Sequence, residues 1–312
     1  MLETDIVFVF GALRSGTTLF RLMLDGHEQI SNPGEVDFLF DHLHRDATHR
    51  TGWRYDLRAL QADRIFQDRG LHCPPGTEGL DLLADFLEQL KRRGGTRIVT
   101  LNLHRHAGEL ATLIPGARVL RLLRDPRDVA RSSIGMGWAG TLYHGVDPWL
   151  GTEMDWKRAR DRFEPDHVLS LKYETLLADP VAELERVCAF LGASYSPAML
   201  DYPSRSTYGP PDVSLTEQWK HKLTPSEIAL VEGKARPIME ELGYRPSGPG
   251  HVPGGFEKVW LDVRNKQKIL AFRMHRFGQM NVILEIVTRK LGLPAHRRLQ
   301  ARFNTITRQY LK

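Results

Sequence analysis

A loop with two glycines, residues 11–18, has the spacing of a phosphate-binding loop. It reads Gly-Ala-Leu-Arg-Ser-Gly-Thr-Thr and follows an apolar run that predicts a strand. In such loops the glycines let backbone N–H groups turn inward, and the next helix adds partial positive charge. Thr17 stands where nucleotide-hydrolysing enzymes have a lysine, while Arg14 lies inside the loop. The loop therefore predicts an anion site unlike that of an ATPase; the alternative is a turn that only caps a helix.

A second segment that could bind an anion begins at Arg124. This arginine ends a predicted strand, and Ser132 follows about two helical turns later. Ligands of open α/β sheets bind at the carboxyl ends of the strands. Arg124 and Ser132 are therefore expected to hold a second phosphate together. The alternative is that Asp125, Arg127 and Asp128 form a surface charge run around a helix start.

The two segments resemble, in the same order, the donor-binding motifs of PAPS-dependent sulfotransferases, whose donor is 3′-phosphoadenosine 5′-phosphosulfate (PAPS). Residues 14–18 resemble the 5′-phosphosulfate loop, and Arg124 with Ser132 resembles the 3′-phosphate clamp. The segment around Tyr173 is similar to the tyrosine-containing strand and helix of many bacterial and Golgi-type members. The resemblance covers about residues 5–246. It assigns donor binding to Arg14, Ser15, Gly16, Thr17, Thr18, Arg124, Ser132 and Tyr173.

The resemblance implies an enzyme that moves a sulfuryl group from PAPS to a hydroxyl of a small-molecule or carbohydrate acceptor and releases PAP. Two alternatives are left open. One is a kinase-like nucleotide-dependent phosphotransferase on the same architecture, which Thr17 and the absence of a clear acidic magnesium-binding strand count against. The other is a binding module that keeps the nucleotide pocket without catalysis.

Glu35 is the candidate general base. It falls where the carbohydrate- and protein-tyrosine-type members place a catalytic glutamate, after the helix that follows the loop. A carboxylate beside the donor can remove the proton of the attacking hydroxyl. The alternative is a glutamate in the first turn of a helix that begins after Pro33 and Gly34, where negative charge is favoured.

One departure from the family concerns the leaving oxygen. Many relatives carry a lysine near this position, but here no lysine occurs in residues 92–156. His104, Arg105 or Arg14 is expected to supply the positive charge instead, with His104 and Arg14 taken as catalytic candidates. His104 and His106 lack an acidic or cysteine partner nearby, so we expect no metal site.

The elements that position these residues alternate between strand and helix patterns, which indicates an α/β fold. We expect a P-loop-containing three-layer fold with a central parallel sheet flanked by helices. The predicted strands are 6–10, 97–101, 118–123 and 168–171; the predicted helices are 17–25, 107–114, 126–133, 180–191 and 225–243. The aromatic segment 135–149 is either an acceptor-stacking loop or a plain packed loop.

The basic excess is confined to the last part of the chain. The net charge is +5, yet residues 247–312 hold 13 Lys and Arg against 3 Asp and Glu. We therefore expect a sulfotransferase-like domain over residues 1–246 and a basic helical extension over 247–312. Packing or dimer exchange is favoured over peripheral membrane contact, because residues 282–287 resemble core material. No nucleic-acid-reading motif is present, and no nucleic acid partner is expected.

The remaining composition bears on compartment. No stretch approaches the length of apolar residues that a membrane span requires, and the first ten residues do not resemble a secretory signal. Cys73 and Cys188 are too few and too far apart for a disulfide framework. A reducing cytoplasm is the expected location.

Overall fold

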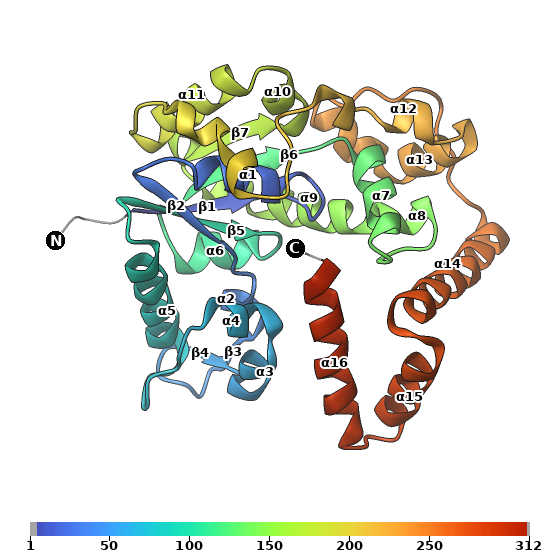
Figure 1. The fold of residues 1–312 in the computed structure, drawn as a ribbon, viewed down its shortest axis with the longest axis horizontal. Helices are drawn as coiled ribbons and strands as arrows, with labels where there is room; N and C mark the ends of the chain where they lie inside the picture. Colours follow the sequence, from blue (N-terminus) through green and yellow to red (C-terminus); the bar gives the residue numbers. More distant parts are fainter. Residues whose placement is uncertain (1–4, 311–312) are drawn as a thin grey trace. The chain divides into compact units, whose positions relative to one another are not determined.

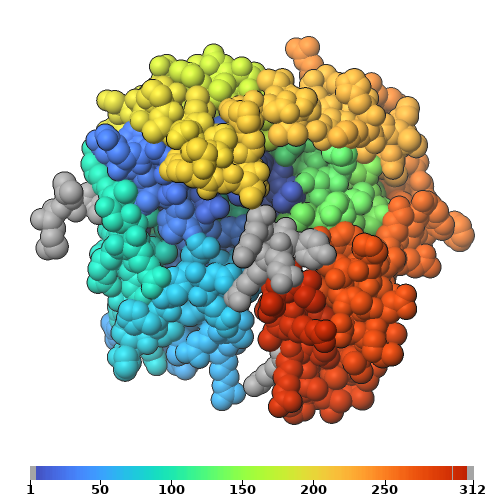
Figure 2. Space-filling view, in the orientation of Figure 1, coloured from blue at the N-terminus to red at the C-terminus, as the bar shows by residue number. Residues whose placement is uncertain are grey.

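The computed structural model describes residues 5–310, which group into two compact units. The first unit is the chain up to Asp125 together with Pro148–Gln218, and the second is Pro126–Asp147 together with the chain from Trp219 onward. Figure 1 shows the elements along the chain, and Figure 2 shows the surface that they form.

The first unit holds the strands and the helices that cover them. Its strands are β1 (Asp5–Phe10), β2 (Ile30–Glu35), β3 (Leu43–Arg45), β4 (Trp53–Tyr55), β5 (Ile98–Leu103), β6 (Arg118–Leu123) and β7 (Val168–Lys172). Its helices are α1 (Thr17–Leu24), α2 (Phe38–Asp41), α3 (Leu57–Ala62), α4 (Arg64–Arg69), α5 (Gly79–Gly94), α6 (Ala107–Leu113), α10 (Tyr173–Ala178), α11 (Pro180–Leu191) and, from Pro148 on, α9 (Asp147–Ala159). Five 3₁₀ turns complete it: η1 (Arg160–Arg162), η2 (Pro165–His167), η3 (Pro197–Leu200), η4 (Tyr202–Arg205) and η5 (Val213–Leu215).

Five of the strands form one parallel sheet in the order β2-β5-β1-β6-β7. Phe10, the last residue of β1, is in register with Leu103 of β5 and Arg121 of β6. The carboxyl ends of the strands therefore share one edge. Because the chain continues from β1 to β2 on one side and reaches β6 on the other, β1 lies at the switch point where α/β proteins bind ligands.

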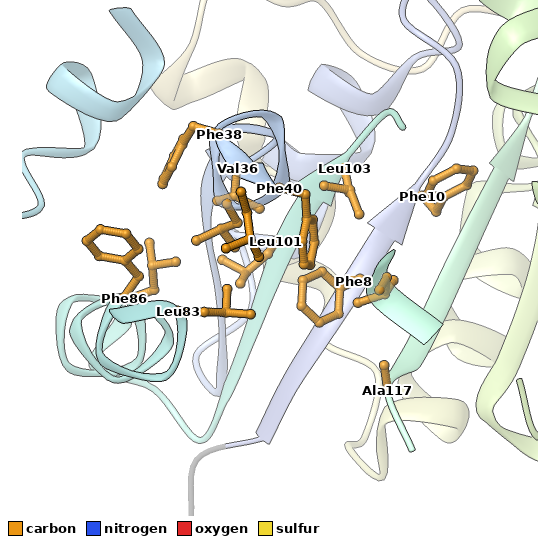
Figure 3. Close-up of a cluster of buried hydrophobic side chains, with 14 of the residues drawn as sticks. Phe8, Phe10, Val36, Phe38, Phe40, Leu83, Phe86, Leu101, Leu103 and Ala117 are labelled. Carbon is orange, nitrogen blue, oxygen red and sulfur yellow. The ribbon is translucent and has the colours of Figure 1, made fainter. Parts of the chain in front are cut away.

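The core lies on both faces of this sheet, because successive side chains of β1 point in opposite directions. Phe8 and Phe10 join a cluster that includes Phe86 of α5 (Figure 3). Leu110 of α6 belongs to the same cluster. Val7 and Val9 join a second cluster, with residues of α1, α10 and α11. A strand buried on both faces reads as a continuous apolar run, which is why its sequence predicted it. The expected three-layer α/β fold is confirmed.

β2 is the strand of this sheet that the sequence did not predict. It contains Pro33 and Gly34, and its register with β5 shifts between Ser31 and Gly34. Proline and glycine occur within strands mainly at such irregularities or at edges, and β2 is an edge strand. The alternative that placed Glu35 in the first turn of a helix is wrong, because Glu35 ends β2 and α2 begins at Phe38.

The second unit is helical within the described residues. It contains α7 (Pro126–Gly135), α8 (Leu142–Gly145), α12 (Trp219–Lys222), α13 (Pro225–Glu241), α14 (Gly255–Phe277), α15 (Gln279–Lys290) and α16 (Ala295–Tyr310). A buried ion pair joins α7 to α13, with Arg127 Nη1 2.7 Å from a Glu232 carboxylate oxygen. The Arg127 guanidinium also lies 3.4 Å from the centre of the Trp219 ring.

Residues 135–147 of the aromatic segment pack against α14 inside this unit. The amide of Gly140 donates to the Asn265 side chain at 2.6 Å, and the Phe272 ring lies where a side chain on Gly137 would be. These contacts favour the packed-loop alternative for the segment. The expected division at residue 246 stays a prediction. Within residues 5–310, every helix is too short or too polar to cross a membrane.

Candidate active site

The loop after β1 is shaped by two residues in the left-handed region of φ, Arg14 at 72° and Gly16 at 91°. The Ser15 amide donates to the Ala12 carbonyl at 3.0 Å and closes the turn that leads into α1. A Cβ on Gly11 would lie 2.5 Å from the Leu122 carbonyl oxygen, so the strand end needs a glycine there. A Cβ on Gly16 would lie 2.2 Å from the ring of Tyr173. Both loop glycines are therefore required by close approach.

The side chain of Ser15 is the first sign of a ligand at this loop. The residue is 1% exposed, and its hydroxyl makes no hydrogen bond within the described part of the chain. Buried hydroxyls in proteins are nearly always hydrogen-bonded. An anion held by the loop would satisfy it, so the residues present fit a phosphate or sulfate group.

Arg124, at the end of β6, lies against the same loop. Its Nη1 donates to the Arg14 carbonyl at 3.0 Å, and its Nη2 donates to the Leu215 carbonyl at 2.9 Å. The guanidinium lies 4.3 Å from the centre of the Tyr173 ring. Burial lowers the pKa of Arg14, and the charge of Arg124 acts in the same direction. Two arginines thus lie at one loop, and a bound anion would offset the repulsion between their positive charges.

Glu35 ends β2, and His104 directly follows β5, the strand between β2 and β1. One Glu35 carboxylate oxygen lies 3.7 Å from Nε2 of His104. The opposite ring nitrogen, Nδ1, donates to the Gly11 carbonyl at 2.7 Å, since a carbonyl oxygen can only accept. The ring therefore links the carboxylate to the first residue of the loop.

The charges of this pair follow from their contacts. The neighbouring His104 lowers the pKa of Glu35 below its ordinary value against the effect of burial, and Arg64 and Arg69 act in the same direction as His104. Burial alone would lower the pKa of His104, but Glu35 and Asp37 together raise it above its ordinary value. A carboxylate facing an imidazolium is the arrangement that both shifts favour.

Backbone contacts fix His104 in place. Its amide donates to the Asp37 carboxylate at 2.8 Å, and its carbonyl accepts a hydrogen bond from the Thr152 hydroxyl at 2.7 Å. The residue is 3% exposed. With its backbone held at two points and its ring at Nδ1, His104 can keep its direction toward Glu35 without help from a substrate.

Arg105, the other candidate for the positive charge in this segment, points to different partners. Its guanidinium is paired with the Asp41 carboxylate through two nitrogens, and Nη1 lies 3.6 Å from Asp37. His106 pairs with the same Asp41 carboxylate at 2.8 Å. Both side chains are committed to a neighbouring acid, so the geometry favours His104 over Arg105 as the replacement for the missing lysine.

Arg69, which also borders Glu35, was not predicted as a site residue. Its Nη1 lies 3.0 Å from where a Cβ on Gly34 would be, and Gly34 has a φ of 102°. Its Nε is buried and makes no hydrogen bond among residues 5–310. Arg69 closes α4, where a basic residue is common for helix-dipole reasons, and so nothing distinguished it in the sequence.

The predicted site residues thus lie along one edge of the sheet. In strand order they are Glu35 after β2, His104 after β5, residues 14–18 after β1, Arg124 after β6 and Tyr173 after β7. Ser132 lies on α7 in the second unit, and its partnership with Arg124 stays a prediction. Among residues 5–310 there is no group of three or more His, Cys, Asp and Glu side chains that could hold a metal.

Comparison with known proteins identifies relatives of this fold and chain. A family model described as the sulfotransferase family matches residues 6–197. A putative protein-tyrosine sulfotransferase of Caenorhabditis briggsae is 25% identical over 208 residues, covering 64% of this chain and 69% of that protein. The protein-tyrosine sulfotransferase of Drosophila melanogaster is 23% identical over 302 residues, covering 87% of this chain and 58% of that protein.

Solved structures agree at the level of the fold. The sulfotransferase domain from the curacin biosynthetic pathway superposes with a TM-score of 0.57 at 19% identity, covering 78% of this chain and 98% of that domain. The sulfotransferase domain of the Synechococcus PCC 7002 olefin synthase gives 0.55 at 21% identity, covering 74% and 95%. With a family match over more than half of its length, the chain belongs to the sulfotransferase family, the enzyme class that its motifs led us to expect.

Proposed function

We propose that this sulfotransferase uses PAPS as its donor and a hydroxyl of a small molecule or carbohydrate as its acceptor, and that PAP is the second product. The observation that carries the donor assignment is the buried Ser15 hydroxyl, which has no hydrogen-bond partner among residues 5–310, in a loop that Arg14 and Arg124 make cationic. PAPS, when bound, supplies the activated sulfuryl group. The rest of the chemistry falls to the side chains at the sheet edge.

Residues 14–18 would hold the 5′-phosphosulfate through backbone amides and the Arg14 and Ser15 side chains. Arg124 and Ser132 would bind the 3′-phosphate, as the family resemblance implies. Tyr173 would pack near the nucleotide, and its ring already lies under the Arg124 guanidinium. Charge-assisted contacts of this kind are about twice as strong as neutral hydrogen bonds.

Glu35 would act as the general base. Its lowered pKa keeps the carboxylate ionised near neutral pH, so it can accept the proton of the acceptor hydroxyl. Its side chain is 39% exposed, which leaves it open to an acceptor, whereas the side chain of Asp37 is 2% exposed. Proton removal by a positioned carboxylate contributes typically about 10² to 10⁴ in rate.

His104 and Arg14 would neutralise negative charge on the transferring group and the leaving oxygen. A protonated His104 beside Gly11 places a fixed positive charge at the loop where many relatives use a lysine. Preorganised cations and backbone amides can supply this stabilisation directly, and the proposed mechanism includes no metal.

The proposal also covers the cellular location of the protein and two kinds of partner. A reducing, cytoplasmic location is consistent with Cys73 and Cys188 being free thiols. A homodimer and a peripheral membrane contact are the two further partnerships expected from the sequence.

Thermal unfolding with candidate nucleotides tests the donor. PAP should raise the melting temperature by mass action, while ATP with Mg²⁺ should leave it unchanged. Arg124→Ala should weaken PAP binding by about 1.5 to 3 kcal/mol, and Arg118→Ala, at the other end of β6, should leave it unchanged. Stabilisation by ATP with Mg²⁺ and not by PAP would favour the phosphotransferase alternative.

Transfer of labelled sulfuryl from PAPS to a panel of phenols and sugars then tests catalysis. Transfer to at least one acceptor is expected. Tight PAP binding without transfer to any member of the panel would favour the non-catalytic alternative.

A further inference from the structure

Helix α14 exposes a stripe of large apolar side chains. Phe256 is 91% exposed, and Val259, Trp260, Val263 and Leu270 are also exposed. At 3.6 residues per turn, these five positions lie within roughly 100° of the helix circumference. The stripe therefore runs along one face of the helix.

The opposite face of α14 is already used for packing. Leu261 is buried, Asn265 accepts from the Gly140 amide, and Asp262 accepts from His144 at 2.8 Å. Phe272 packs on Gly137. The helix is thus seated on its own unit, and the exposed stripe is the face left over.

Helix α15, which contacts α14, carries a second exposed stripe. Its exposed apolar residues are Met280, Ile283, Leu284 and Val287, and the exposed Leu291 follows directly after its end. The expectation that residues 282–287 are core material holds for Val282 alone among the hydrophobic residues of that stretch. Packing of this stretch within its own chain is therefore only partial, and dimer exchange stays a prediction.

The C-terminal helices are nevertheless a folded structure with their own small core. The buried Glu285 pairs with Arg273 at 2.8 Å, and the Phe277 ring of α14 stacks on Phe303 of α16 at 4.4 Å between ring centres. The apolar stripes are exposed on an ordered scaffold.

Basic residues border the α14 stripe on both sides. Arg264 and Lys266 lie about 80° to either side of the stripe centre. The two acids of the helix have intramolecular partners, since Glu257 pairs with His251 at 2.7 Å and Asp262 with His144. The border of the stripe is therefore cationic.

The cationic border distinguishes between two possible partners for the exposed stripe of α14. A second copy of the chain, paired stripe to stripe, would bring the same cationic borders together with no unpaired acid of α14 to receive them. An anionic phospholipid surface offers an apolar layer for the stripe and negative headgroups for its borders, and Trp260 is of the residue type enriched at such interfaces. We infer that α14 docks in the plane of an anionic membrane surface.

Co-sedimentation of the full chain with vesicles tests this. The chain should sediment with vesicles of equimolar phosphatidylcholine and phosphatidylglycerol and should remain in solution with phosphatidylcholine alone. The triple variant Phe256→Ser, Trp260→Ser, Val263→Ser should lose at least about tenfold in partitioning. The pair Arg264→Gln, Lys266→Gln should lose about fivefold per charge.

The matched control replaces exposed apolar residues of the first unit, Met154→Ser with Val181→Ser, and should sediment like the parent. Unchanged melting temperatures would show that the variants fold. Equal binding to both vesicle types, or no binding to either, would overturn the inference. So would a parent dimer that the triple variant converts to monomer without any vesicle binding, since the stripe would then be an interface between copies.

Discussion

The contact between Glu35 and His104 links the proposed base to the phosphate-binding loop. Nδ1 of His104 must carry a hydrogen to bond the Gly11 carbonyl, so the opposite nitrogen is the one that gains or loses a proton. A neutral Nε2 would direct its lone pair at a carboxylate 3.7 Å away, which is unfavourable. The proton on His104 and the negative charge on Glu35 therefore stabilise one another.

Replacing Glu35 tests its assignment as base. Glu35→Gln keeps the shape of the side chain but cannot take a proton, so turnover should fall by at least about 10²-fold. Donor affinity should stay near that of the parent, because the donor contacts come from other residues. Steady-state kinetics with PAPS and calorimetry with PAP measure the two quantities.

A matched control is Glu28→Gln, an exposed glutamate that precedes β2. It should leave turnover unchanged. If Glu35→Gln kept turnover within a factor of about three of the parent, the base would have to be another group.

The pH dependence of catalysis follows from the same two shifts. Glu35 must be ionised, and its pKa lies below its ordinary value; His104 must be protonated, and its pKa lies above its ordinary value. Activity should therefore rise with pH at a value below about 4.3 and fall only at a value above about 6.5. The profile of kcat/KM against pH should show a broad plateau between these limits.

His104→Gln should remove the alkaline limb of that profile and move the acid limb to higher pH, because Glu35 loses the positive neighbour that lowers its pKa. A parent profile that instead rises through pH 6 to 7 would mean that a neutral histidine is the active form.

At the scale of single residues, the sequence identified candidates for the positive charge at the leaving oxygen but could not choose among them. His104 and Arg105 are adjacent, and what separates them is Asp41, more than sixty residues away in sequence, which pairs with Arg105. Arg69 escaped notice for the same reason, since its approach to Gly34 depends on how α4 packs against β2.

Among the elements, the loop between β1 and α1 depends on its contact with the start of α10. Tyr173 begins α10, and its ring occupies the space beside Gly16. Gly16→Ala would place a methyl group 2.2 Å from that ring at a φ of 91°. We expect it to lower the free energy of unfolding by about 1 to 3 kcal/mol and to weaken PAP binding strongly, because the amides of the loop must shift.

The comparison variant is Gly151→Ala in α9, where a Cβ would meet no atom within 4 Å. A glycine-to-alanine change inside a helix should raise the free energy of unfolding by about 0.5 to 1 kcal/mol and leave PAP binding unchanged. Chemical denaturation with calorimetry compares the pair, and equal effects of the two changes would contradict the role given to the Gly16 contact.

The elements that sequence patterns predicted best were those buried on both faces. Strands β1, β5, β6 and β7 each appear within a few residues of the expected ranges, because a central parallel strand is a continuous apolar run. β2 was missed because Pro33 and Gly34 contradict a strand pattern locally, while its pairing with β5, a strand far along the chain, maintains it. Local patterns contain no information about such a partner.

At the scale of the whole molecule, the basic excess and the proposed catalytic residues lie in different units. All the proposed catalytic residues belong to the first unit, whereas the basic segment from residue 247 belongs to the second. The inferred membrane contact therefore uses residues that the sulfotransfer chemistry does not. Substitutions in the α14 stripe should leave sulfotransfer measurable, and substitutions of the catalytic residues should leave membrane binding measurable.

Deleting residues 255–312 separates the two roles. The shortened chain retains α7, α8, α12 and α13, together with the ion pair between Arg127 and Glu232. The two core clusters of the sheet contain no residue of the deleted segment. We expect a folded protein whose melting temperature still rises with PAP and that no longer sediments with phosphatidylglycerol vesicles. A truncated chain that aggregates would show instead that the deleted helices are needed to bury apolar surface. The segment around Gly137 and Gly140, which packs against α14, would then be exposed to water.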